Sequence, residues 1–191
     1  MWTLGGFNTA DPESATRVLT ACCASPAWAE RLAAARPYDT LAALTGAALA
    51  AFDALDDTEI RRAVDAHPRI GGGAKRPLAV PAGNAGVAAD ARGRGPARPS
   101  GPEAEWSRGE QARAMTAGAA VQAALAEANA AYEHRFGHVF LICATGLAAE
   151  DILAAARRRL ANDEAAERAE TRAELRKIVA LRLDKAFGED R

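Results

Sequence analysis

Apolar residues recur at intervals of three and four along most of the chain, which is the spacing of one face of an α-helix. Each of these stripes predicts a helix with one buried side. The clearest stripes are Leu41, Leu44, Ala48 and Phe52; Ile60 and Val64; Ala114, Met115, Val121, Leu125 and Tyr132; and Ile178, Leu181 and Phe187.

Short polar residues precede the stripes at the positions where helices begin. A Ser, Thr or Asp side chain can accept a hydrogen bond from the first turn, and proline is tolerated at the first helical position. The predicted starts are Asp11-Pro12, Ser25-Pro26, Asp39 or Thr40, Asp56, Ser107 and Asp163. The longest helix should run from about Ser107 to Arg135 and end at Gly137, and a further helix should span 147–160.

Two segments depart from this pattern. Residues 72–102 are dominated by Gly, Pro, Ala and Arg, so they cannot bury enough apolar area to offset the entropy of ordering. We expect a flexible, disordered surface insertion there. Residues 138–145 have strand-like content, which predicts a short extended segment. The fold class is therefore all-α: a single-domain helical bundle over 1–191, with that extended segment and the insertion.

Composition narrows the classes of function. Apolar residues make up 49% of the 191, and much of that share is alanine, the best helix former. The formal charge of −1 gives no reason to expect a nucleic acid or an anionic membrane as partner. No apolar run approaches the ~20 residues of a membrane span, and the N-terminus does not resemble a signal peptide. Three cysteines, two of them adjacent, favour reduced thiols and a cytoplasmic protein.

His67 is the first candidate for chemistry. It continues the apolar stripe of Ile60 and Val64, so it should lie on the buried side of its helix, in the last turn before Pro68. Imidazole exchanges protons near neutral pH because its unperturbed pKa is about 6.5. A helix C-terminus favours the charged ring and burial favours the neutral ring. A structural histidine at a helix end is the alternative.

Two other features could bind a small molecule, and a third has the spacing of a metal site. Ser107 and Glu110 form a capping-box pattern, which serves the helix itself but also presents backbone N–H groups to a ligand. Arg159 and Arg182, on the last two predicted helices, could each bind a carboxylate through two parallel hydrogen bonds. His134 and His138 are four residues apart, but Gly137 should end the helix between them, so we expect no metal site.

Three ordered motifs resemble the family of 2-oxo-4-hydroxy-4-carboxy-5-ureidoimidazoline (OHCU) decarboxylases, which act between urate and allantoin. They are His67-Pro68-Arg69-Ile70-Gly71, then Ser107-x-x-Glu110-Gln111, then Asn129-x-x-Tyr132-x-x-Arg135-Phe136-Gly137-His138-Val139-Phe140. The similarity extends from Phe7-Asn8 to the final helix and leaves out the insertion.

The resemblance implies an all-α enzyme of purine breakdown that forms (S)-allantoin, needs no metal or organic cofactor and is often a homodimer. It implies that His67 is the catalytic acid or base and that Glu110 works beside it. The implied substrate-binding residues are Pro68, Ser107, Gln111, Ile142, Cys143, Ala144, Thr145, Gly146 and a late-helix arginine, with Arg182 favoured over Arg159.

The insertion lengthens the connection between His67 and Ser107 beyond what the family typically has. If the insertion loops out, it lowers the stability of the fold only slightly, because the entropic cost of closing a loop grows only logarithmically with loop length. If it folds over the pocket, it could change which substrate enters. Two alternatives to the main hypothesis stay open: a relative acting on another ureido or carboxylated heterocycle, and a helical binding or interaction module without catalytic activity.

Overall fold

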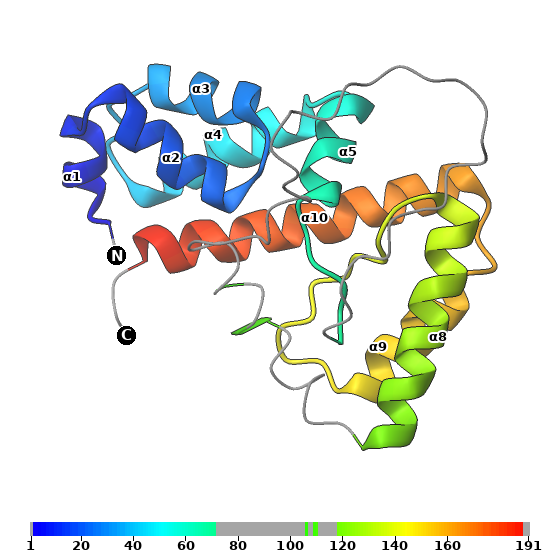
Figure 1. Ribbon diagram of the computed structural model, residues 1–191. Helices are drawn as coiled ribbons and strands as arrows, with labels where there is room; N and C mark the ends of the chain where they lie inside the picture. The colour runs from blue at the N-terminus through cyan, green and yellow to red at the C-terminus, as the bar shows by residue number, and fades with distance from the viewer. Residues whose placement is uncertain (1, 72–105, 107–108, 111–117, 189–191) are drawn as a thin grey trace, which may run out of the picture.

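The computed structural model describes residues 2–71, 106, 109–110 and 118–188 (Figure 1). Within these ranges every regular element is a helix, which confirms the all-α class. The helices are α1 (Leu4–Thr9), α2 (Pro12–Cys22), α3 (Pro26–Ala34), α4 (Leu41–Asp53), α5 (Asp57–Asp65), α8 (Ala119–Phe136), α9 (Ala149–Arg159) and α10 (Glu164–Phe187). None of these helices is long and apolar enough to cross a membrane.

Five of the predicted starts are confirmed by the capping bonds themselves. In each case a side-chain oxygen accepts a hydrogen bond from the backbone N–H three residues later, over 2.8–3.2 Å. The capping residues are Asp11, Ser25, Thr40, Asp56 and Asp163. Each bond satisfies one of the N–H groups that a helix start leaves without a helical partner.

The prediction of one long helix from Ser107 to Arg135 is wrong. Helix α8 begins at Ala119, and Gly118 stands before it in an extended conformation (φ −60°, ψ 155°) as the N-cap. Glycine costs a helix interior about 1 kcal/mol relative to alanine and is tolerated at the N-cap, so the break falls where propensity is weakest. The predicted end is right, because Gly137 is left-handed with φ +73°. The insertion at 72–102 lies outside the described residues.

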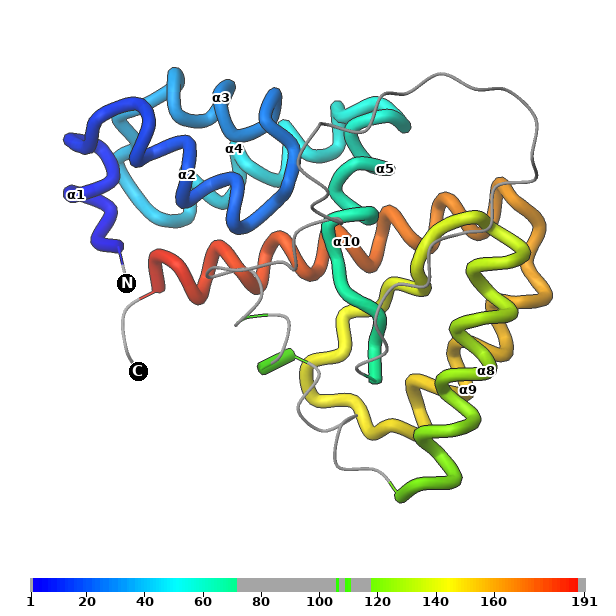
Figure 2. The backbone as a smooth tube through the Cα atoms, in the orientation of Figure 1, coloured from blue at the N-terminus to red at the C-terminus, as the bar shows by residue number. Residues whose placement is uncertain are grey.

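The buried apolar side chains form two clusters. The first cluster is built from α1 to α5 and includes Ile178, Val179 and Leu183 from the C-terminal half of α10. The second is built mainly from α8 and α9. In Figure 2, α1 to α4 lie along one end of α10, and α8 and α9 lie at its other end. The long helix thus contributes side chains to the first cluster, while its Glu167 and Thr171 join it to α8 and α9 through polar contacts.

An extended segment passes between the two clusters. Val139, Leu141 and Cys143 contribute to the first cluster. Phe140, Ile142 and Ala144 contribute to the second. The alternation of one residue to each side is the period of an extended chain, and it explains the strand-like sequence without a partner strand in the described ranges. The predicted extended segment is confirmed.

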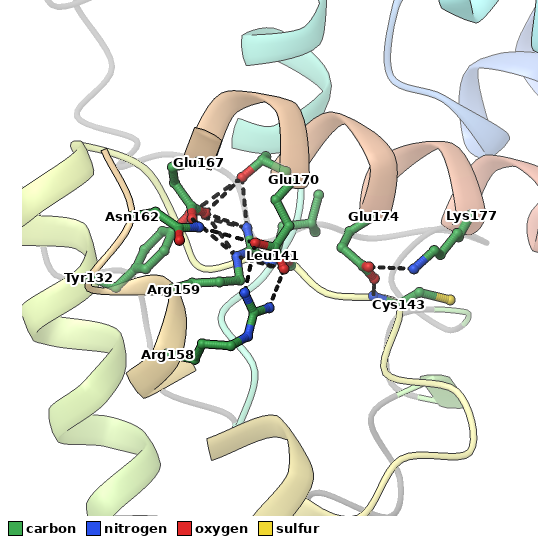
Figure 3. A network of polar contacts seen from close by, with 11 residues as sticks. Tyr132, Leu141, Cys143, Arg158, Arg159, Asn162, Glu167, Glu170, Glu174 and Lys177 are labelled. Carbon is green, nitrogen blue, oxygen red and sulfur yellow. Dashed lines mark hydrogen bonds and ion pairs between the residues drawn. The ribbon is translucent and has the colours of Figure 1, made fainter. Parts of the chain in front are cut away.

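A buried polar network joins α8, α9 and α10 to this segment (Figure 3). Arg159, which is fully buried, pairs with the Glu167 carboxylate, its Nε lying 3.0 Å from Oε1. Its Nη1 donates to the Leu141 carbonyl oxygen over 2.7 Å, and its Nη2 donates to Thr171 Oγ1 over 2.8 Å. The Tyr132 hydroxyl donates to the same carboxylate. One guanidinium therefore fixes three helices and the extended segment together.

The charges of this network depend on one another. Burial alone would raise the pKa of Glu167, but the hydrogen bonds from Arg159 and Tyr132 outweigh it and lower that pKa below 4.5. Burial, with the adjoining Glu167, raises the pKa of the Tyr132 hydroxyl. The carboxylate is thus ionised and the phenol protonated near neutral pH.

We expect Glu167→Gln to destabilise the fold by about 3–5 kcal/mol near neutral pH, because it removes the buried counter-charge of Arg159 and leaves only Glu170, whose Oε1 lies 4.0 Å from Nε. The free energy of unfolding from urea titrations measures this. The control is Glu164→Gln, which removes an exposed carboxylate 3.9 Å from Arg168 and should cost less than about 1 kcal/mol.

Wild type and Glu167→Gln also test how the free energy of unfolding depends on pH. Since the folded-state pKa of Glu167 is lowered, its contribution is present above about 4.5 and is lost as pH falls through the folded value. The difference between wild type and Glu167→Gln should therefore shrink in acid. A difference that stays constant down to about pH 3 would contradict the assignment.

Candidate active site

His67 lies two residues beyond the end of α5 and is 6% exposed. Its expected burial is confirmed, whereas its expected place in the last helical turn is wrong, since α5 ends at Asp65. The ring Nδ1 lies 2.8 Å from the Ala63 carbonyl oxygen. A carbonyl only accepts hydrogen bonds, so Nδ1 carries a proton and Nε2 is the basic nitrogen of the neutral ring.

The residues after His67 are anchored to α8. Arg69 forms an ion pair with Glu133 through Nε and Nη2, both partners being mostly buried. The Asn129 amide donates to the Ile70 carbonyl oxygen over 2.9 Å. Ile70 itself is 4% exposed and belongs to the second cluster. The His67-Pro68 step is thus held by α5 on one side and by α8 on the other.

Glu110 is a buried carboxylate that α10 holds with two cations. Its oxygens lie 3.3 Å from Arg182 Nε and 3.2 Å from Arg182 Nη2, the two-bond geometry that a guanidinium offers a carboxylate. Lys185 Nζ lies 3.3 Å from Oε1. Glu110 and Arg182 are 9% and 3% exposed. Glu110 is therefore attached to the last helix by charge.

The backbone at 142–146 is held from both sides by α9 and α10. Arg159 binds the Leu141 carbonyl oxygen, and Glu174 Oε2 accepts the Cys143 N–H over 2.9 Å (Figure 3). Gly146 then turns the chain with φ +84°, a conformation that L side chains rarely adopt. One carbonyl and one amide on either side of Ile142 are thus fixed by buried or partly buried side chains.

Glu110 and this backbone segment share one electrostatic environment. Burial raises the pKa of the Cys143 thiol, a hydrogen bond from the Thr145 backbone opposes the shift, and the negative charges of Glu174 and Glu110 raise the pKa further. The structure therefore brings Glu110 and Arg182 together, and the charge of Glu110 acts on the Cys143 thiol. That the 142–146 backbone lines the same site stays a prediction. That His67 faces the same cavity stays a prediction.

The two candidate arginines differ in their surroundings. All three nitrogens of the Arg159 guanidinium bond to protein groups inside the buried network. Arg182 instead lies beside Glu110 and forms with it the charged part of the candidate site. The contacts of Arg159 are those of a structural residue, and the choice of Arg182 as the substrate-binding arginine stays a prediction.

The structure does not place every residue that the sequence proposed for the site. Ser107 and Gln111 lie outside the described residues. Of the proposed backbone lining, Ala144 is buried while Thr145 is exposed. His134 and His138 are separated by the helix end at Gly137, and His138 Nδ1 bonds to the Val139 carbonyl oxygen over 3.0 Å.

Two residues of this region were missing from the sequence prediction. Lys185 contacts Glu110, and its position three residues after Arg182 puts it on the same face of α10, which the helical spacing could have indicated. Glu174 binds a backbone N–H 31 residues away along the chain, and no local pattern indicates such a bond.

Comparison with known proteins identifies similar chains. The family model described as OHCU decarboxylase matches residues 8–184. The uric acid degradation bifunctional protein TTL of Arabidopsis thaliana is 29% identical over 168 residues, covering 88% of this chain and 46% of that protein. The chain therefore spans about half the length of this curated relative.

Two solved structures share the fold. A crystal structure of OHCU decarboxylase in the presence of (S)-allantoin matches with a TM-score of 0.69 and 24% identity, covering 94% of this chain and 100% of the other. A structure of (S)-allantoin synthase matches with a TM-score of 0.64 and 14% identity, covering 97% of this chain and 54% of the other.

Proposed function

Because the chain belongs to the OHCU decarboxylase family, we propose that it converts OHCU to (S)-allantoin in urate breakdown, with His67, Glu110 and Arg182 as its working groups. The observation that supports the assignment of residues is the buried Glu110–Arg182 pair on α10, the helix whose Glu174 also fixes the Cys143 N–H. Buried charges are costly to maintain, and a buried charged pair is typical of a binding site for a polar molecule.

The substrate itself can supply the electron sink of this reaction. When the bond to the carboxylate breaks, its electron pair forms a ring C=C bond, and the adjacent C=N accepts the displaced pair together with a proton. Loss of the hydroxyl proton and protonation of the neighbouring carbon then give allantoin. The protein has to orient the ring, move these protons and protect one face, so the proposed reaction needs no cofactor.

His67 is the proton-transferring group in this proposal. The bond from Nδ1 to the Ala63 carbonyl oxygen orients the ring and leaves Nε2 as the base that takes the hydroxyl proton and returns a proton to carbon. Return from one fixed direction would give the S configuration. The anchoring of Arg69 and Ile70 on α8 supports such a fixed direction.

Glu110 and Arg182 hold the polar groups of the substrate in this proposal. Arg182 presents a cation for a carboxylate or ring oxygen, and Glu110 accepts hydrogen bonds from the ring or its hydroxyl. Peptide groups of 142–146 complete the cavity. The remaining proposed lining residues are Pro68, Ser107 and Gln111.

The proposal extends to the setting of the protein. None of the three cysteines forms a disulfide, which supports a reducing compartment such as the cytoplasm. A homodimer is the proposed assembly, following the family resemblance. Sedimentation equilibrium would test the assembly directly.

The decisive experiment supplies freshly generated OHCU and follows allantoin by chiral chromatography. The wild type should form (S)-allantoin well above the spontaneous rate, and His67→Asn should lose about 10²–10⁴-fold in turnover, the usual contribution of a general acid or base. His134→Asn, a change at an exposed histidine, is the control and should keep full activity.

Glu110→Gln should lower kcat/KM by at least about 10-fold, because it removes the charge that faces Arg182 and Lys185. The exposed Glu127→Gln is the matched control. Thermal unfolding of each variant separates lost turnover from lost structure. A racemic product formed at the spontaneous rate by folded wild type would refute the proposed function.

Glu174 should act as a positioning residue through the Cys143 N–H. Glu174→Ala frees the 142–146 backbone and should lower kcat/KM about 10–100-fold, the scale of a displacement of about 1 Å in a catalytic geometry. Glu174→Gln keeps an oxygen acceptor and should recover most of the rate. Equal losses in both variants would contradict a role through this hydrogen bond.

A further inference from the structure

A cavity lies between α5 and the N-terminal half of α10. Its volume is about 330 Å³, within the range of small-molecule sites. The residues that line it are Asp57, Ile60, Arg61, Val64, His138, Arg168, Ala169, Thr171 and Arg172. The ten residues of α10 from Arg172 to Arg182 correspond to about 15 Å of helix, so the cavity lies away from the Glu110–Arg182 pair.

The cavity has an apolar floor and a cationic rim. Ile60, Val64 and Ala169 supply the apolar surface, and three guanidinium groups stand against the single carboxylate of Asp57. Two of these cations already have acidic neighbours. Arg61 Nε lies 3.2 Å from Asp65, and Arg168 Nη1 lies 3.9 Å from Glu164.

Arg172 differs from the other two arginines. Its Nη2 donates to three backbone carbonyl oxygens at the end of α4, those of Phe52, Asp53 and Leu55, over 2.8–3.2 Å. These partners are neutral, and over the described part of the chain Arg172 enters no ion pair. Its position is fixed, its positive charge is not neutralised by a carboxylate, and Nε and Nη1 keep their donor capacity there.

His138 contributes a different group to the cavity. Its Nδ1 donates to the Val139 carbonyl oxygen over 3.0 Å, which makes Nε2 an acceptor in the neutral ring. Burial lowers the pKa of His138, so the neutral ring dominates near pH 7. The cavity thus offers fixed cations, an apolar floor and one hydrogen-bond acceptor.

We infer that this cavity binds a small planar organic anion, with its charged group on Arg172 and Arg168, its flat body on Ile60, Val64 and Ala169, and an N–H or O–H directed at His138. A free inorganic anion would leave the apolar floor exposed to water, and a neutral ring would leave the Arg172 charge without compensation. The ligand class that satisfies both surfaces is an aromatic or heterocyclic carboxylate.

Indole-3-carboxylate is the probe, because it combines a carboxylate, a flat apolar body and an N–H. Isothermal titration should give a dissociation constant on the order of 1 mM or tighter. The neutral indole-3-carboxamide should bind at least about 10-fold more weakly, the usual value of a charge-assisted hydrogen bond. Equal affinity for acid and amide would overturn the inference.

Substitutions inside and outside the cavity show where the probe binds. Arg172→Gln and Ala169→Phe should each weaken binding at least about 10-fold, the first by removing the charge and the second by filling the cavity. Ala169 is exposed and caps no helix, so Ala169→Phe remains informative if Arg172→Gln does not fold. The controls Arg157→Gln and Ala154→Phe, both at exposed positions of α9, should leave the affinity unchanged.

The candidate active site also offers cations, so it must be separated from this cavity. His67→Asn should leave the affinity for indole-3-carboxylate unchanged. Weaker binding in that variant, together with unchanged binding in Ala169→Phe, would assign the probe to the active site and overturn the inference. Neither result bears on turnover of OHCU, which the chiral assay tests by itself.

Discussion

The buried pair of Arg159 and Glu167 is the interaction on which the rest of the structure depends. A guanidinium and a carboxylate removed from water are stable only when each hydrogen-bonding group finds a partner. Here those partners come from α8, α10 and the extended segment, through Tyr132, Thr171 and the Leu141 carbonyl oxygen. The need to satisfy one buried cation therefore determines how three helices and a non-helical segment meet.

The same network also positions part of the candidate active site. Because Leu141 is fixed from α9, the peptide groups that follow it have a defined direction, and Glu174 fixes the next one. Arg182 lies further along the same helix as Glu174 and forms an ion pair with Glu110. A single helix thus supports the buried network, the backbone lining and the charged pair of the site, which keeps their relative positions within the tolerance of one rigid element.

Local patterns predicted much of this fold, and their limits are physical. The helix starts were predictable because a cap involves residues only three apart, and His67 was placed on a buried side by the stripe of Ile60 and Val64. Gly118 shows the opposite case: the apolar pattern continues across it, yet the backbone turns there. Glu174 could not be found from the sequence, since its partner is a backbone N–H brought near only by tertiary packing. The capping-box pattern singled out Glu110, and the family resemblance favoured Arg182 over Arg159.

The extended segment between the two clusters limits how this protein can vary. Its side chains alternate between two packed interiors, so a single inserted or deleted residue would send every later side chain into the wrong cluster. The same packing occupies both faces of the segment, leaving mainly its peptide groups to meet a ligand. Discrimination among ligands must then come from the side chains around it, while the segment itself contributes a constant pattern of donors and acceptors.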